Sequence, residues 1–251
     1  MIVMGILNVT PDSFADGGRH NEFTQAVNRG LEMISEGVDI IDIGGESTKP
    51  GAERVSEEEE LARVIPVIEA LSKHNVQLSI DTMRSSTARF AINAGAHIIN
   101  DVSGGLADEH MLATAAELNT PYIAMHWRGH SKDMNSRAVY ADVVAEVISE
   151  LAARIKAARE AGIAKEKIII DPGIGFAKEA EHNWEIIDSI DQFVATGYPV
   201  LIGASRKRFL GGDNPDDREL ATIALTQRLA LSGIWGVRVH TVAPHKEVLG
   251  A

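Results

Sequence analysis

The sequence predicts a single (β/α)8 TIM barrel, and three observations predict it. The chain has 251 residues, an ordinary length for one barrel domain. Eight short apolar runs recur along it, separated by segments with helical spacing. Each run ends in a polar residue, and the carboxyl ends of barrel strands form the functional face of this fold. We therefore expect one domain over residues 1–251, with the polar strand ends meeting at one mouth.

The run that ends at Asp171 is the clearest of the eight strands. Three consecutive isoleucines, Ile168–Ile170, favour a strand buried on both faces, as in a parallel sheet covered by helices. Pro172 and the glycines at 173 and 175 follow, so Asp171 lies at a rigid exit from strand to loop. Its carboxylate either faces a ligand or caps the next turn.

The other strands are predicted from runs with the same design. They are Ile2–Asn8, Ile40–Asp42, Leu78–Asp81, Ile98–Asp101, Tyr122–His126, Val200–Ser205 and Val237–His240. Helical spacing predicts helices near 22–35, 57–71, 141–161 and 182–194. Ser56 and Glu59 form a capping box, so the acidic run after Ser56 is structural. Ser85 and Asp108 are expected to cap the helices that follow them, and the eighth helix is expected to be short.

Composition excludes several classes of protein. The formal net charge is −12, from 36 acidic and 24 basic residues, which argues against nucleic-acid and anionic-membrane partners. The absence of cysteine excludes disulfides and thiolate chemistry. A strand begins at the N-terminus without a basic leader, and no apolar run reaches about 18 residues. We expect a cytoplasmic protein.

Cations gather after the last two strands despite the negative net charge. Arg206, Lys207 and Arg208 follow the strand that ends at Ser205, and we expect them to open a helix whose N-terminus binds an anion. Arg238 and His240 are two residues apart and therefore share a strand face. At the end of the first strand, Asn8 offers a neutral oxygen ligand for a hard cation. His126 is either a hydrogen-bonded structural residue or a base.

Seven blocks of sequence resemble the dihydropteroate synthase family in order and spacing. They are Met4–Phe14, Asp42–Thr48, Ser79–Thr82, Ile99–Gly104, Asp171–Phe176, Gly203–Phe209 and Arg238–His240. The resemblance covers nearly the whole chain. Three further pieces, Trp127-Arg128, His182-Asn-Trp184 and Trp235–Arg238, look similar to actinobacterial members of the family.

The resemblance implies a transferase that condenses (7,8-dihydropterin-6-yl)methyl diphosphate with 4-aminobenzoate, by an SN1-like displacement that releases pyrophosphate with Mg2+ as cofactor. The roles that it implies are pterin binding by Asp81, Asn100, Asp171 and Lys207, pyrophosphate binding by Asn8, Lys49, Arg238 and His240, and aminobenzoate binding by Thr48, Pro50, Phe176, Ser205 and Arg206. Lys207, Arg238, His240 and Asp81 would be catalytic, Asn8 would hold the metal, and a loop with Phe14 and Asp16 would close over the site. A homodimer and sulfonamide binding are also implied.

Three departures from the family pattern stand in the chain. Lys49 replaces a usual arginine, Thr241 replaces a usual aspartate after His240, and only eleven residues follow His240. Two other functions therefore stay open. One is a corrinoid-linked methyltetrahydrofolate methyltransferase domain, and the other is a pterin-binding paralogue without catalytic activity.

Overall fold

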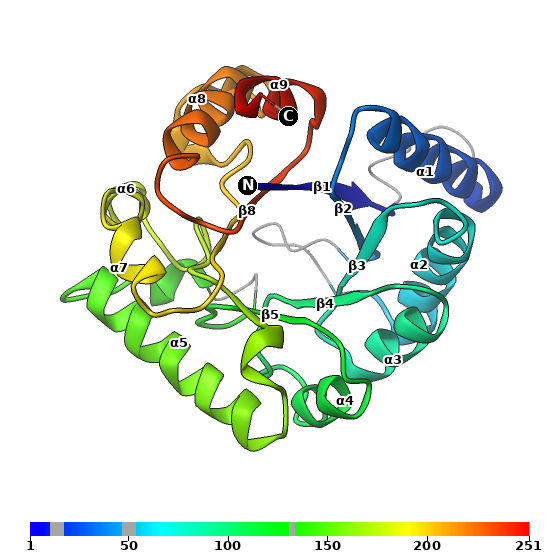
Figure 1. Ribbon diagram of the computed structural model, residues 1–251, viewed down its shortest axis with the longest axis horizontal. Coiled ribbons are helices and arrows are strands. Elements are labelled where there is room, and N and C mark those ends of the chain that lie inside the picture. Colours follow the sequence, from blue (N-terminus) through cyan, green and yellow to red (C-terminus); the bar gives the residue numbers. More distant parts are fainter. Residues whose placement is uncertain (11–17, 47–53, 131–133, 251) are drawn as a thin grey trace.

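The computed structural model describes residues 1–10, 18–46, 54–130 and 134–250. Its eight strands pair in parallel in the order β6-β5-β4-β3-β2-β1-β8-β7, and helices surround them (Figure 1). A parallel bridge between Ile170 and Val200 joins the two outer strands of that order. The sheet is thereby closed, and the predicted (β/α)8 barrel is confirmed.

The strands occupy the predicted runs. They are β1 Ile2–Asn8, β2 Ile40–Gly44, β3 Gln77–Asp81, β4 Ile98–Asp101, β5 Tyr122–Met125, β6 Ile168–Asp171, β7 Leu201–Ile202 and β8 Gly236–Val239. The helices are α1 Gly18–Ser35, α2 Glu57–Leu71, α3 Ser85–Asn93, α4 Met111–Glu117, α5 Val143–Glu160, α6 Ala180–Asp188, α7 Ile190–Val194, α8 Glu219–Leu229 and α9 Ala243–Leu249. The helix after β8, α9, has seven residues and is short, as predicted.

Two helix predictions need correction. The helix expected over 182–194 is two helices, because Ser189 leaves the helical conformation with φ −107° and ψ 26°. Ser85 and Asp108 are not the N-cap residues of the helices that follow them, which are Arg84 and His110. Asp108 accepts the backbone N–H of His110 through Oδ1 at 2.9 Å and that of Ser85 through Oδ2 at 2.7 Å, so its carboxylate also caps the start of α3 from a distant loop.

The acidic run forms the first turn of α2, and its described contacts are structural. The Ser56 hydroxyl accepts the backbone N–H of Glu59 at 3.2 Å and caps the helix. Glu60 is buried and accepts the hydroxyl of Thr82 at 2.6 Å and the guanidinium of Arg84 at 2.5 Å. These contacts join α2 to the end of β3.

Two apolar layers divide the core according to strand parity. Residues such as Val3, Ile41 and Ile170 point outward and pack against the helices in one large cluster. The alternate residues point inward and form a small cluster of Met4, Ile40, Ile98, Ile123, Ile169 and Leu201. Across the described ranges, no helix combines the length and the apolar composition needed to cross a bilayer.

Candidate active site

The polar ends of several strands meet at one level inside the barrel. Asp42, Asn100 and Asp171 each lie two residues beyond a member of the inner apolar cluster, so they share its inward direction. Asp81 pairs with Asn100 in the register between β3 and β4. All four side chains are buried. The apolar layer therefore closes the barrel below a polar mouth.

Four of these side chains form one hydrogen-bonded group, which we call the acid–arginine cluster: Asp42, Asp81, Asn100 and Arg238. The Arg238 guanidinium donates from Nε to Oδ2 of Asp42 at 2.6 Å and from a terminal nitrogen to Oδ2 of Asp81 at 2.7 Å. The amide of Asn100 donates to the same oxygen of Asp42 at 2.9 Å. Side chains from β2, β3, β4 and β8 are thus tied together by three bonds.

Asp42 is the residue that sequence reasoning missed. Its side chain is fully buried, and one oxygen accepts both Arg238 and Asn100. The other oxygen, Oδ1, has no hydrogen-bond partner among the described residues. Its position at the end of the apolar run Ile40–Asp42 was the available signal, because Asn100 and Asp171 were predicted from the ends of such runs. Asp42 therefore orients two predicted site residues, Asn100 and Arg238.

The Asp81 carboxyl is tuned by its surroundings. Burial raises its pKa to about 7, the nearby charge of Arg238 opposes the rise, and the carboxylates of Asp42, Glu60 and Asp101 add to it. Near neutral pH both protonation states of Asp81 are therefore accessible. A ligand that donates hydrogen bonds to this oxygen favours the ionised state.

A second region of the mouth contains Asp171 and Lys207. We call it the loop flank, because the loop of residues 172–177 contacts both side chains. Oδ1 of Asp171 accepts the backbone N–H of Gly173 at 2.7 Å. A Cβ built on Gly203 would lie 3.6 Å from Oδ2 of Asp171 and 4.0 Å from Cβ of Arg238, so Gly203 separates the two flanks. Burial raises the pKa of Asp171, while Gly173, Lys207 and Arg238 oppose the rise.

The loop after β6 holds Lys207 in place. The Lys207 ammonium donates to the carbonyl of Ile174 and lies 4.4 Å from the centre of the Phe176 ring. Gly175 has φ +76°, and a Cβ there would lie 2.7 Å from Cδ of Lys207. Glycine is therefore required for the lysine to pass. Burial lowers the pKa of Lys207 to about 8, and the charge of Asp171 opposes that fall.

Ser205 contacts the ring of His240. The Ser205 hydroxyl oxygen accepts the backbone N–H of His240 at 3.2 Å and lies 2.9 Å from its Nδ1. In the tautomer in which Nδ1 accepts the Ser205 hydroxyl, the ring proton is on Nε2. Burial lowers the pKa of His240 to about 3, and the charges of Arg238 and Arg206 act in the same direction. His240 is accordingly a neutral donor near neutral pH.

The predicted helix at Ser205 and Arg206 is wrong. The chain makes two three-residue 3-10 turns, Arg208–Leu210 and Asp216–Arg218, before α8 begins at Glu219. Gly211 and Gly212, with φ +87° and +75°, interrupt any continuous helix. The backbone of Arg206 is left-handed, with φ +59°.

Arg206 and Thr241 are both tied to Glu219 at the start of α8. Arg206 donates to Glu219 at 2.6 Å and to Asp216 at 2.8 Å. The hydroxyl of Thr241, the residue that departs from the family pattern, also donates to Glu219. Among the described residues, Ser205 rather than Thr241 contacts the His240 ring with its side chain.

Some predicted site residues lie outside the described ranges. They are Phe14, Asp16, Thr48, Lys49 and Pro50. Asn8 is described and is the last residue of β1, next to Gly44 in the register. The described residues include no group of three or more His, Asp or Glu side chains that could hold a metal ion.

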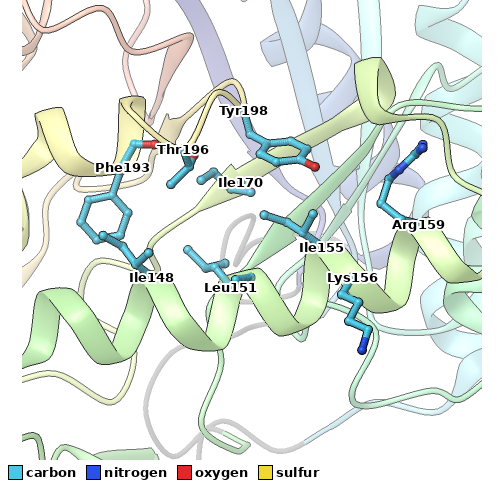
Figure 2. Close-up of a pocket in the computed structure, with 10 residues that line it drawn as sticks. Ile148, Leu151, Ile155, Lys156, Arg159, Ile170, Phe193, Thr196 and Tyr198 are labelled. Atoms are coloured by element: carbon cyan, nitrogen blue, oxygen red, sulfur yellow. Dashed lines mark hydrogen bonds between the residues drawn. The ribbon is translucent and has the colours of Figure 1, made fainter.

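A separate cavity lies outside the barrel and differs in chemistry from the mouth. Its volume is about 420 Å³, and Figure 2 shows the side chains of α5 facing those of β6, α7 and the segment after α7. The lining includes Leu151, Ile170, Phe193 and Tyr198, with Lys156 and Arg159 beside them. It contains no carboxylate. Ile170 points outward and Asp171 inward, so β6 separates this cavity from the acid–arginine cluster.

Comparison with known proteins assigns the class of this barrel. A family model described as pterin binding enzyme matches residues 4–240, which include β2 to β8, most of β1 and all of the acid–arginine cluster. The match places the chain among the pterin-binding enzymes.

Individual relatives narrow the assignment. A dihydropteroate synthase of Mycobacterium leprae is 47% identical over 257 residues, which cover 98% of this chain and 90% of that protein. The solved structure of Xanthomonas albilineans dihydropteroate synthase with 4-aminobenzoic acid is 44% identical, with a TM-score of 0.93 and coverage of 99% and 90%. A structure of the same enzyme with 7,8-dihydropteroate is 41% identical, with a TM-score of 0.90 and coverage of 99% and 91%. The chain belongs to the dihydropteroate synthase family.

Proposed function

We propose that this chain condenses (7,8-dihydropterin-6-yl)methyl diphosphate with 4-aminobenzoate to give 7,8-dihydropteroate and pyrophosphate. The proposal rests on one observation, which is that the acid–arginine cluster and the loop flank lie close together at the barrel mouth. Arg238 is bonded to Asp42 and Asp81 and lies close enough to Asp171 for its charge to oppose the raised pKa of that carboxyl. Acids, an amide and cations are therefore within reach of one ligand.

Asp171 and Asn100 are suited to the edge of a pterin ring. That edge presents adjacent N–H donors with an acceptor beside them, so a carboxylate can accept two bonds while an amide supplies one donor and one acceptor. Asp81 and Lys207 complete the pterin subsite. The buried Asp81 also places negative charge where the pterin methylene becomes positive.

The leaving diphosphate is bound by His240, Arg238, Asn8 and Lys49. The bond between the methylene carbon and the diphosphate oxygen breaks first, and pyrophosphate leaves with the electron pair in an SN1-like step. Nε2–H of His240 donates to that anion, and a guanidinium has five N–H donors, so two carboxylates do not exhaust Arg238. Mg2+, held by Asn8 and the phosphates, supplies further positive charge when bound.

The aminobenzoate subsite lies beside Phe176, Ser205 and Arg206. The aniline nitrogen attacks the methylene cation and loses a proton after the bond has formed, so no general base has to act beforehand. The ring of Phe176 offers an apolar face next to the Lys207 ammonium. Thr48 and Pro50 would line the rest of this subsite, and the loop with Phe14 and Asp16 would close over it.

A pyrophosphate-release assay with each substrate alone and with both tests this function. The synthase releases pyrophosphate only when both substrates are present with Mg2+. A pterin-binding paralogue binds the pterin diphosphate without release, and a methyltransferase domain consumes methyltetrahydrofolate instead. Either of these two results would replace the proposal.

Two further parts of the proposal have their own tests. Sulfonamides are isosteres of aminobenzoate, so a sulfonamide should raise the melting temperature in the presence of pyrophosphate. No rise would contradict the aminobenzoate subsite. The proposal also includes a homodimer, and a monomer in light scattering of the purified chain would remove that part.

A further inference from the structure

We infer that Lys178 is a positioning residue that sets the place of Phe176, and through it the aminobenzoate subsite, from outside the pocket. The inference rests on the proposed function for the identity of that ligand. Lys178 follows the loop after β6 and plays no part in the mechanism above. Its ammonium donates to the carbonyls of Gly173 and Phe176, each at 3.1 Å, and contacts Nδ1 of His126 at 2.9 Å.

The three contacts of Lys178 use all of its donors. In its charged form Lys178 has three N–H groups and no acceptor, so Nδ1 of His126 is then the acceptor of the third bond. The proton of His126 is then on Nε2, which lies 2.9 Å from Oε2 of Glu150 on α5. His126 is only 1% exposed, so this geometry is fixed by packing. The structural interpretation of His126 is thereby favoured over that of a base.

The chain of contacts is anchored at its far end on α5. Arg128 donates from Nε to both oxygens of Glu150, at 3.1 and 3.2 Å, and to Glu146 at 2.8 Å. Its guanidinium also lies 3.9 Å from the centre of the Tyr140 ring, and the Tyr140 hydroxyl donates to the carbonyl of Ala177 at 2.9 Å. Lysine and tyrosine therefore hold neighbouring loop carbonyls from one network.

The loop needs such side-chain donors because its backbone cannot supply a regular ladder. Gly173, Gly175 and Ala177 have φ of +69°, +76° and +48°. Ala177 is not a glycine, and an alanine in this region of backbone space is strained and persists only when its surroundings hold it there. Carbonyls in such a loop point in several directions, so each requires its own partner.

Phe176 is the residue that transmits this restraint to the site. Lys178 holds its carbonyl, while its ring lies 4.4 Å from the Lys207 ammonium, and Lys207 in turn donates to the carbonyl of Ile174. Asp171 belongs to β6 and is held by the sheet. Loss of Lys178 should therefore displace Phe176 more than Asp171, and so weaken aminobenzoate binding more than pterin binding. Burial lowers the pKa of Lys178 to about 7, in keeping with its enclosed position.

The test compares steady-state kinetics of wild type, Lys178→Met and Lys165→Met in the pyrophosphate-release assay. Methionine keeps the length of the side chain and removes the ammonium. Lys165 lies at the opposite end of β6, with its ammonium 5.4 Å from the centre of the Tyr198 ring, and is the matched control. We expect Lys178→Met to raise the KM for 4-aminobenzoate by about 10-fold or more, as a misplaced subsite would. The KM for the pterin diphosphate should stay within about 3-fold, and Lys165→Met should match wild type.

Three outcomes would overturn the inference. They are unchanged KM values in Lys178→Met, an equal rise in both KM values, and the same rise in Lys165→Met. If Lys178→Met does not fold, His126→Gln replaces it, because glutamine cannot contact Lys178 and Glu150 with the ring geometry and should give the same selective rise. An inactive wild type would count against the proposed function instead, so the two failures are distinguishable.

Discussion

The two flanks of the barrel mouth balance their charges in different ways. In the acid–arginine cluster, Arg238 is bonded directly to the carboxylates of Asp42 and Asp81, and all partners belong to strands. On the loop flank, Lys207 donates to a backbone carbonyl and Asp171 accepts a backbone N–H, so the loop after β6 lies between them. The first flank is fixed by the sheet, whereas the second depends on how the loop is held.

Because of this difference, substitutions in the acid–arginine cluster should reduce mainly stability, and substitutions on the loop flank should reduce mainly activity. Removing the cation of a buried, strand-borne ion pair leaves charges without compensation and should cost folding energy. Removing a cation that is desolvated and held by a loop should cost mainly activity.

Arg238→Met should give the largest loss. It leaves Asp42 and Asp81 buried without their shared partner, and breaking such a pair costs roughly 3–5 kcal/mol in the free energy of unfolding. Urea unfolding measures it. Arg89→Met, which removes an exposed pair with Glu117, is the control and should cost no more than about 1 kcal/mol. Equal costs for the two variants would contradict the contrast.

Lys207→Ala should separate activity from stability. The buried ammonium is costly to keep charged, as its lowered pKa of about 8 indicates, so its removal should change the free energy of unfolding by no more than about 1 kcal/mol. Turnover should fall by roughly 100-fold or more, as for other preplaced groups in active sites. Pyrophosphate release and urea unfolding are measured on the same preparation. A Lys207→Ala enzyme that keeps its turnover but loses stability would contradict this prediction.

His126→Gln should change how stability depends on pH. Burial, followed by the charge of Lys178, lowers the pKa of His126 to about 4, whereas the unfolded side chain titrates near 6.5. Between these values the unfolded chain binds the proton and the folded chain does not, so falling pH destabilises wild type through this histidine. Between about pH 7 and pH 4.5 the variant should lose on the order of 2 kcal/mol less than wild type. Urea unfolding at both pH values measures this difference. An equal loss of unfolding free energy in wild type and variant would contradict a neutral, buried His126.

Thr241→Ala should have the smallest effect. It removes the hydroxyl that donates to Glu219, a half-exposed contact worth about 0.5–1 kcal/mol. Turnover should stay within about 2-fold, because Ser205 orients the His240 ring. A large fall in turnover would mean that residue 241 acts on His240 after all.

Strand ends explain how much of the site the sequence could predict. Asp81, Asn100 and Asp171 were predicted because each lies at or next to the end of a buried run, and Arg238 because it shares a strand face with His240. These patterns could not assign partners across strands. Arg238 lies 196 positions from Asp42 in the chain, and their bond depends on barrel closure.

Loops and caps were predicted less well for physical reasons. The helix expected at Ser205 is absent because Gly211 and Gly212 adopt left-handed backbone angles that local spacing does not reveal. Asp108 caps α3 from another loop, and a cap from a distant residue has no local signature. The link from Lys178 to His126 joins the ends of two adjacent strands, so it too appears only in the folded chain.

A crystal structure of this chain with 7,8-dihydropteroate would test the meeting of the two flanks most directly. The account predicts the pterin ring within hydrogen-bond distance of Asn100 and Asp171, with the aminobenzoyl ring against Phe176. A ligand bound in the outer cavity between α5 and α7, or at the mouth without contact to both flanks, would contradict it.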